Sequence, residues 1–312
     1  MDRVESAYAH RVERQSLSSG QRERLRRSIR SSRSGRLLYG KVVTPEEDAK
    51  LRHLGQALET VSRWESDVTG SQAAGAWQTA PGSELETDDK LAHPFNVSPV
   101  PWSAITAAVS HLGALRDSLF QSTGPAEVRA RIHTHGQLTL VRGALENASM
   151  AFWLLEDDRS VERIVRRMQE DWEEVRQLEV VRTEVGSPSP KTMVDREKEM
   201  TDLLVKVGGD PSRLKKRPGY GEIVKLAGAS QPTGAKTAFV TWKACSSVAH
   251  GELRGLIAYL KNMAVGSPLP GMQLNHVTGN IDLMSIGGMI AIGTTREALR
   301  LYAKRSGTNI AI

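Results

Sequence analysis

Cysteine is almost absent from this chain, because Cys245 is the only cysteine among its 312 residues. A single thiol excludes an internal disulfide and a zinc site built from several cysteines. Low cysteine content also suits a reducing compartment, in which disulfides do not persist. The framework of a small, disulfide-stapled secreted domain is therefore excluded, and the fold must depend on an apolar core.

Long apolar runs are missing as well. A helix that spans a membrane needs ~20 mostly apolar residues. The longest such stretch here, Leu283 to Gly293, has 11 residues and is typical of a buried helix segment. The first residues also lack the apolar run of a secretory signal. We expect a cytoplasmic protein that does not insert into a membrane.

Neither an internal repeat nor the alternation of apolar and polar residues that marks half-buried strands is evident. Apolar residues recur instead at steps of three and four, as in amphipathic helices. With 39% apolar residues and 27 glycines, the composition is that of an ordinary globular protein. We therefore predict an all-α protein whose residues 101–312 form a single helical bundle of five to seven helices.

An amphipathic helix is predicted ahead of the bundle, over residues 42–65, because Thr44 suits an N-cap and Pro45 the first helical position. Residues 66–100 are rich in Gly, Ser, Thr and Pro, which predicts a linker or a draped loop and places a domain boundary there. Within the bundle we expect helices over about 102–122, 126–155, 157–185, 191–207, 237–264 and 279–304. The third should bury an apolar stripe of Ile164, Met168, Trp172, Val175 and Leu178.

Two segments resemble ligand motifs without satisfying them. Gly228 to Lys236 has five residues between its glycines, and Ala235 separates the second glycine from the lysine, so it is not a phosphate-binding loop. His133 and His135 are two residues apart and would point to different faces of a helix. We therefore expect no cofactor and no metal.

Positive charge is concentrated at the start of the chain. Residues 1–41 hold eleven Arg or Lys and four Asp or Glu, a net of +7, whereas the whole chain carries +6. With only two spaced apolar residues in its arginine run, this segment cannot bury a face, and we expect a flexible basic arm. Its candidate nucleic-acid-binding residues are Arg22, Arg24, Arg26, Arg27, Arg30, Arg33 and Arg36.

Such an arm fits an RNA or DNA partner, because arginines that neutralise phosphates release counterions. The run lacks interleaved aromatic residues, so we do not expect it to stack on bases. A solvated basic tail with no dedicated partner explains the same composition.

Candidate catalytic residues lie on two predicted helix faces. Arg142 and Glu146 can pair at i,i+4 on the second bundle helix. Lys243, Ser246 and His250 line one face of a later helix, and Gly251 would let another backbone approach the histidine. If the two helices face each other, Glu146 could orient the His250 imidazole for general acid–base work. The alternative is a satisfied hydrogen-bond network that locks the register of the helices.

At these residues the chain resembles a group of actinobacterial helical proteins. The shared pieces are Leu140-Val-Arg-Gly-Ala-Leu-Glu146 with Trp153-Leu-Leu155, an arginine-rich helix, and Ser246-Ser-Val-Ala-His-Gly251. The arginines of that helix are Arg159, Arg163, Arg166 and Arg167. The resemblance covers about residues 105–255 and implies an all-helical fold without an established activity.

More distantly, the chain is similar to the HEPN superfamily of helical bundles, which includes toxin-type ribonucleases with an Arg four to six residues before a His. Lys243, with six residues before His250, stands where that Arg is expected. The resemblance implies that His250 acts as the base on a ribose 2′-hydroxyl and that Lys243 steadies the phosphate. The replacement of Arg by Lys puts that chemistry in doubt.

These observations lead to two functional hypotheses. The first is a HEPN-like protein that binds nucleic acid, as a metal-independent endoribonuclease or as a defence or stress component. The second is a non-enzymatic interaction or scaffold module, which could form a homodimer through the apolar helix at 281–301. A small-molecule binder is a third reading, but Trp153, Trp172 and Trp242 are more typical of a core.

Overall fold

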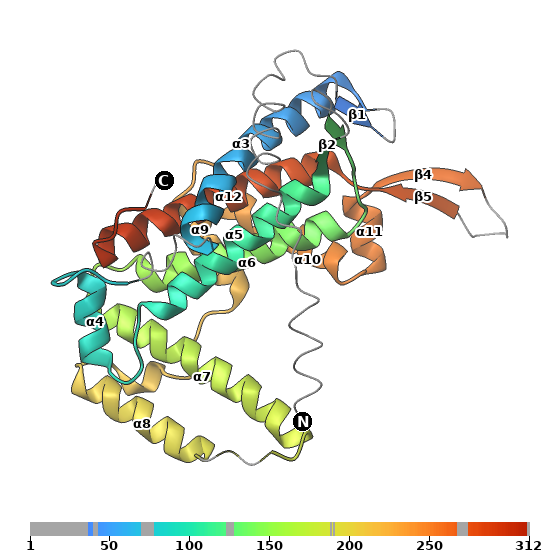
Figure 1. Cartoon of the computed structure of the whole chain (residues 1–312). Helices are drawn as coiled ribbons and strands as arrows, with labels where there is room; N and C mark the ends of the chain where they lie inside the picture. The colour runs from blue at the N-terminus through green and yellow to red at the C-terminus, as the bar shows by residue number, and fades with distance from the viewer. Residues whose placement is uncertain are drawn as a thin grey trace, which may run out of the picture. The chain divides into compact units, whose positions relative to one another are not determined.

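The computed structural model describes residues 37–39, 43–69, 78–122, 128–187, 189, 191–266 and 274–310. The described residues are mainly helical, with two small sheets (Figure 1). The predicted all-α class is therefore confirmed. The chain divides into two compact units: Met1–Val43 with Phe120–Arg131, and Thr44–Leu119 with Ile132–Ile312.

The described part of the first unit is a three-stranded sheet. Strand β3 (Val128–Ala130) pairs in parallel with β1 (Leu37–Tyr39) and antiparallel with β2 (Phe120–Ser122). The prediction of a continuous helix over 126–155 was thus wrong for residues 128–135, since that helix begins only at Gly136. Apolar content alone does not distinguish a short buried strand from the start of a helix.

The second unit begins with α3 (Pro45–Thr69), where the sequence prediction is confirmed. The Thr44 hydroxyl accepts from the Glu47 amide at 3.2 Å, and the Glu47 carboxylate accepts from the Thr44 amide at 2.9 Å. This reciprocal capping starts the helix at Pro45. The apolar stripe of α3 is fully buried against α5 (Pro99–Leu119) and α12 (Ile281–Ser306), and it consists of Leu51, Leu54, Leu58, Val61 and Trp64.

Helix α3 is therefore part of the bundle, and the domain boundary placed within residues 66–100 does not separate them. The described part of that segment also contains a helix, α4 (Glu84–Ala92), whose N-cap Ser83 accepts from the Glu86 amide. The sequence prediction missed this short helix because it followed the Gly and Pro content of the segment. In so short an element, the N-cap at Ser83 outweighs composition.

Helix α6 (Gly136–Leu155) is central, as its apolar residues predicted. It packs against α5, α12, α9 (Tyr220–Ala229) and α10 (Gly234–Ala249). The C-terminal helix α12 has buried residues along its whole length. Among its large apolar side chains only Ile286, 49% exposed, lies at the surface. Its apolar side chains already pack within the unit, so it does not present the apolar face that the predicted homodimer required.

Helix α7 (Ser160–Glu184) departs from its predicted stripe. Ile164 and Met168 are buried, but Trp172 and Val175 are only partly covered and Leu178 is 47% exposed. Its first half packs on the bundle, whereas its second half is accompanied by α8 (Met193–Lys206), which Figure 1 shows below α7. A helical period predicts which residues share a face, but not what covers it.

A short helical turn, η2 (Pro211–Arg213), precedes α9, and α11 (Leu253–Tyr259) follows α10. A two-stranded ribbon, β4 (Lys261–Gly266) with β5 (Leu274–Thr278), then leads to α12. No helix in the part of the chain that the structure describes is long and apolar enough to cross a membrane.

Candidate functional site

The two predicted polar faces meet. Arg142 Nε on α6 donates to Glu146 Oε1 at 2.8 Å, as expected for an i,i+4 pair. Arg142 Nη1 lies 2.9 Å from Nε2 of His250, at the end of α10. The Trp242 indole, also on α10, donates to Glu146 Oε1 at 2.8 Å. Four side chains from two helices thus form one cluster, which we call the Arg142 cluster.

The end of α10 holds His250 in place. His250 is the C-cap, and the following Gly251 has φ +68°. The Gly251 amide donates to Val248 and the Glu252 amide to Ser247, which is the Schellman arrangement of a helix end. Nothing lies within 4 Å of a Cβ placed on Gly251. The glycine therefore ends the helix, and the predicted close approach of another backbone at this position was wrong.

The partner of His250 differs from the one we expected. A guanidinium only donates hydrogen bonds, so Nε2 of His250 must accept from Arg142 and carries no proton in this geometry. Glu146 was predicted to orient this imidazole, but its carboxylate accepts from Arg142 and Trp242 instead. Arg142 stands between Glu146 and His250. The arrangement leaves an exposed imidazole whose Nε2 lone pair accepts a hydrogen bond from a cation.

Sequence reasoning missed His111 on α5. Its Nε2 lies 2.8 Å from the place that a Cβ on Gly143 would occupy, so the glycine admits the ring against α6. Burial lowers the pKa of His111, and the nearby Glu146 carboxylate raises it in part. The signal in the sequence was a glycine beside Arg142 on an otherwise side-chain-rich helix, but nothing local showed which residue fills the gap.

Within the described structure, neither Lys243 nor Ser246 joins the cluster through a side-chain hydrogen bond or ion pair. Ser246 is buried at 8% exposure, and its carbonyl accepts from the His250 amide. Lys243 is exposed. The other predicted catalytic residues, Arg142, Glu146 and His250, are brought together.

Basic and aromatic residues surround the cluster along α10. This helix contains Lys236 and Lys243 and no acidic residue, and neither lysine has an ion pair among the residues that the structure describes. The Lys225 ammonium of α9 lies 4.4 Å from the centroid of the Phe239 ring. Phe239 in turn lies against Trp242, with ring centroids 5.9 Å apart. We call the surface that carries Lys236, Phe239, Trp242 and Lys243 the α10 face.

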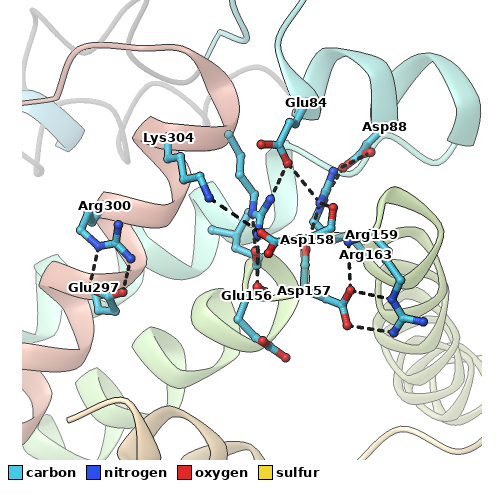
Figure 2. A network of polar contacts seen from close by, with 12 residues as sticks. Glu84, Asp88, Glu156, Asp157, Asp158, Arg159, Arg163, Glu297, Arg300 and Lys304 are labelled. Atoms are coloured by element: carbon cyan, nitrogen blue, oxygen red, sulfur yellow. Dashed lines mark hydrogen bonds and ion pairs between the residues drawn. The ribbon is translucent and has the colours of Figure 1, made fainter.

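The arginines in the first half of α7 make structural contacts with neighbouring elements. Asp88 of α4 is fully buried and accepts from Arg163 Nε at 2.6 Å and Nη2 at 3.0 Å. Arg163 Nη1 also donates to the carbonyls of Asp157 and Asp158, both at 2.9 Å. Arg305 of α12, 1% exposed, donates to the Leu155 and Glu156 carbonyls. Figure 2 shows these contacts, which join α4, the α6–α7 turn, α7 and α12 and which we call the arginine network.

Arg166 and Arg167 make the same kind of contact. Arg166 donates to the Trp153 carbonyl and pairs with Glu156 at 2.9 Å. Arg167 donates to the Asn96 carbonyl at 3.0 Å and pairs with Asp171. Only Arg159 remains largely exposed, paired with Asp157. The arginine-rich helix that carried the resemblance is thus occupied by structural contacts.

The candidate residues of the basic arm, Arg22 to Arg36, lie outside the described residues. Within the described ranges, no group of three or more His, Cys, Asp and Glu side chains is placed to hold a metal ion. No protein-family model, curated protein or solved structure matches this chain. The resemblance to the HEPN superfamily therefore stays a prediction, and any function must be argued from the site.

Proposed function

We propose that this protein binds nucleic acid along the α10 face, with the Arg142 cluster at one end of the contact. The observation that carries the proposal is the charge of α10, whose two lysines have neither an acidic neighbour on the helix nor an ion pair in the described structure. Most other cations of this unit are paired, as in the arginine network. Unpaired cations are the ones available to phosphates.

The geometry of the face suits a phosphate backbone. Lys236 and Lys243 are seven residues apart, or about 10 Å along a helix that rises ~1.5 Å per residue, and Arg254 of α11 adds a further exposed cation. Phe239 and Trp242 lie between the lysines in sequence and supply partly exposed rings. Cations interleaved with aromatic rings are the pattern by which proteins hold single strands.

Cleavage of RNA is a second candidate activity, favoured by the contact of Arg142 with His250. A phosphate drawn to Arg142 would compete for the guanidinium and free Nε2 of His250. That nitrogen can then take the proton of a ribose 2′-hydroxyl while Arg142 offsets the charge on the phosphate. Because Glu146 does not contact His250 in this geometry, orientation of the freed imidazole falls to the helix end.

The test of binding is the anisotropy of a labelled single-stranded RNA titrated with the full chain at several salt concentrations. The double variant Lys236→Ala/Lys243→Ala should weaken binding, and each lost phosphate contact should lower the salt slope by ~0.7. Lys198→Ala, at a 76% exposed position on α8, is the matched control. Unchanged binding by the double variant sinks the proposal. Deletion of residues 1–36 measures what the arm adds.

The test of cleavage uses the same RNA with a chelator present. If His250 is the base, His250→Ala abolishes product formation while RNA affinity stays within about threefold. Arg142→Ala should reduce both. Cleavage that survives in His250→Ala would come from elsewhere, and the absence of cleavage in the unaltered protein would leave a binding protein.

A further inference from the structure

A cavity of about 490 Å³ lies beside α7, away from the residues named by the sequence. Its walls come from the middle of α7 and from the segment between η2 and α9. Trp172 forms one wall, and the cavity is also lined by Arg176, Lys215, Arg217 and Glu173. Ligand pockets in proteins are commonly ~300–1,000 Å³, so the volume suits a single ring system with its substituents.

The chemistry of the lining points to a flat, anionic ligand. The Lys215 ammonium lies 5.0 Å from the centroid of the Trp172 ring, so one face of the ring is met by a cation and not by packed side chains. Lys215 is 54% exposed and its ion-pair partner Glu197 is 39% exposed. An exposed pair of this kind is easily exchanged for another partner. A planar ring can therefore replace the ammonium on Trp172 while the lysine moves to an attached phosphate.

Two arginines flank that position. Arg176 pairs with Glu173, and this contact, together with Gln177, lowers the pKa of Glu173 to about 2. Arg217 pairs with Glu170, and its guanidinium lies 4.8 Å from the centroid of the Tyr220 ring. The Arg176 side chain is 50% exposed and keeps N–H groups that can meet a phosphate oxygen without breaking its ion pair. Arg217 is 13% exposed and also donates to the Pro218 carbonyl at 3.1 Å, so it forms the wall of the cavity.

The cavity adjoins the α10 face through the first turn of α9. Arg217, which lines the cavity, stacks on Tyr220. The next residue, Gly221, approaches α10 so closely that a Cβ there would lie 2.9 Å from the Phe239 ring. Burial raises the pKa of Tyr220, and Glu146 of the Arg142 cluster adds to the shift. Cavity and cluster thus border the same short helix.

From this lining and this continuity we propose that the Trp172 cavity binds a nucleobase, stacked on the indole with its phosphate between Arg176 and Lys215. The base belongs to a free nucleotide or to a single strand that continues from the α10 face. The second source rests on the proposed function, and the first does not. Trp172 is thereby a binding residue and not the core residue that its position in the helix predicted.

The experiment is isothermal titration of the full chain with AMP, adenosine, ribose 5-phosphate and a single-stranded RNA of about ten nucleotides. AMP should bind and ribose 5-phosphate should not, because the base supplies the stacking. Trp172→Ala should weaken AMP at least about fivefold, the lower limit for loss of one stacked base. Trp172→Phe, which keeps an aromatic face, should stay within about threefold. Equal binding of ribose 5-phosphate, or no loss in Trp172→Ala, overturns the proposal.

A second variant guards against misfolding of Trp172→Ala. Lys215 is 54% exposed, so Lys215→Ala should keep the melting temperature. It should weaken AMP about threefold or more and leave adenosine unchanged, since only the phosphate contact is lost. Equal losses for AMP and adenosine, or none for AMP, count against the assigned phosphate position.

The variants separate this proposal from the function of the α10 face. Loss of RNA binding in Lys236→Ala/Lys243→Ala but not in Trp172→Ala keeps the function and removes the single strand as the source of the base. If Trp172→Ala weakens AMP but neither variant weakens RNA, the proposal for the cavity holds and the proposal for the α10 face fails. Loss of RNA affinity in both supports one continuous strand site.

Discussion

The arginine network and the Arg142 cluster are both built around arginine, and they differ in how fully the charges are matched. In the network, Arg163 is 2% exposed on its side chain and Asp88 is fully buried, and carbonyl oxygens of the α6–α7 turn take the remaining N–H groups. In the cluster, the Arg142 side chain is 24% exposed and its guanidinium ends on an exposed imidazole.

The comparison teaches where to look for function in a protein rich in ion pairs. A buried cation whose donors are all used is held by the fold, since freeing it would leave an uncompensated charge. A cation that ends on a neutral, exposed group can change partner at little cost.

Asp88→Ala should lower the free energy of unfolding by ~3–5 kcal/mol, because Arg163 stays buried and loses its one buried carboxylate partner, keeping only Glu84, which is 42% exposed and 3.3 Å away. Urea unfolding followed by circular dichroism measures the change. The double variant Asp88→Ala/Arg163→Met should recover part of the loss, because no unpaired charge remains. A cost below about 1 kcal/mol for Asp88→Ala would mean that the arginine network contributes little to the stability of the fold.

Acid should weaken the ion pairs at the start of α7. The hydrogen bond from Arg159 lowers the pKa of Asp157 to about 2, and bonds from Arg213 lower that of Glu162. A folded-state pKa below the unfolded value gives stability that is present above the unfolded pKa and lost as pH falls towards the folded one. The melting temperature should therefore fall between about pH 4.5 and pH 2, and NMR titration of both carboxyls checks the cause. Unshifted carboxyl pKa values contradict the assignment.

Glu146→Gln should cost ~1 kcal/mol, because the amide still accepts from Trp242 but no longer pairs with Arg142. The same change should lower the pKa of His111 further, since the carboxylate that raises it is gone while burial remains. Proton NMR titration of His111 reads this shift directly. A His111 pKa that does not move would show that Glu146 does not face this ring.

His250→Ala should change the free energy of unfolding by less than about 0.5 kcal/mol, since the side chain is exposed. Glu297→Ala, which removes an exposed pair with Arg300, is the matched control and should behave alike. If His250→Ala instead costs several times more than the control, the cluster is a structural lock like the network, and the comparison fails.

The fold was largely predictable because its signals are local. Thr44 and Pro45 mark the start of α3, and steps of three and four residues mark the buried faces of α3 and α6. The small sheet at 120–130 was missed, because three-residue strands leave too little pattern to read. The candidate site was predictable only in part. Arg142 pairs with Glu146 within one helix, but His111 and Trp242 reach the cluster from other helices.

By itself, the sequence determined the helical class, the N-terminal cap of α3 and the i,i+4 pair of α6, since each depends on residues within one or two turns. Only the tertiary structure decided that Arg142 meets His250, that the arginines in the first half of α7 make structural contacts, and that Trp172 lines a cavity. These outcomes depend on which helices pack together. Packing selects among partners that are remote along the chain, and a helical period records a face but not its neighbour.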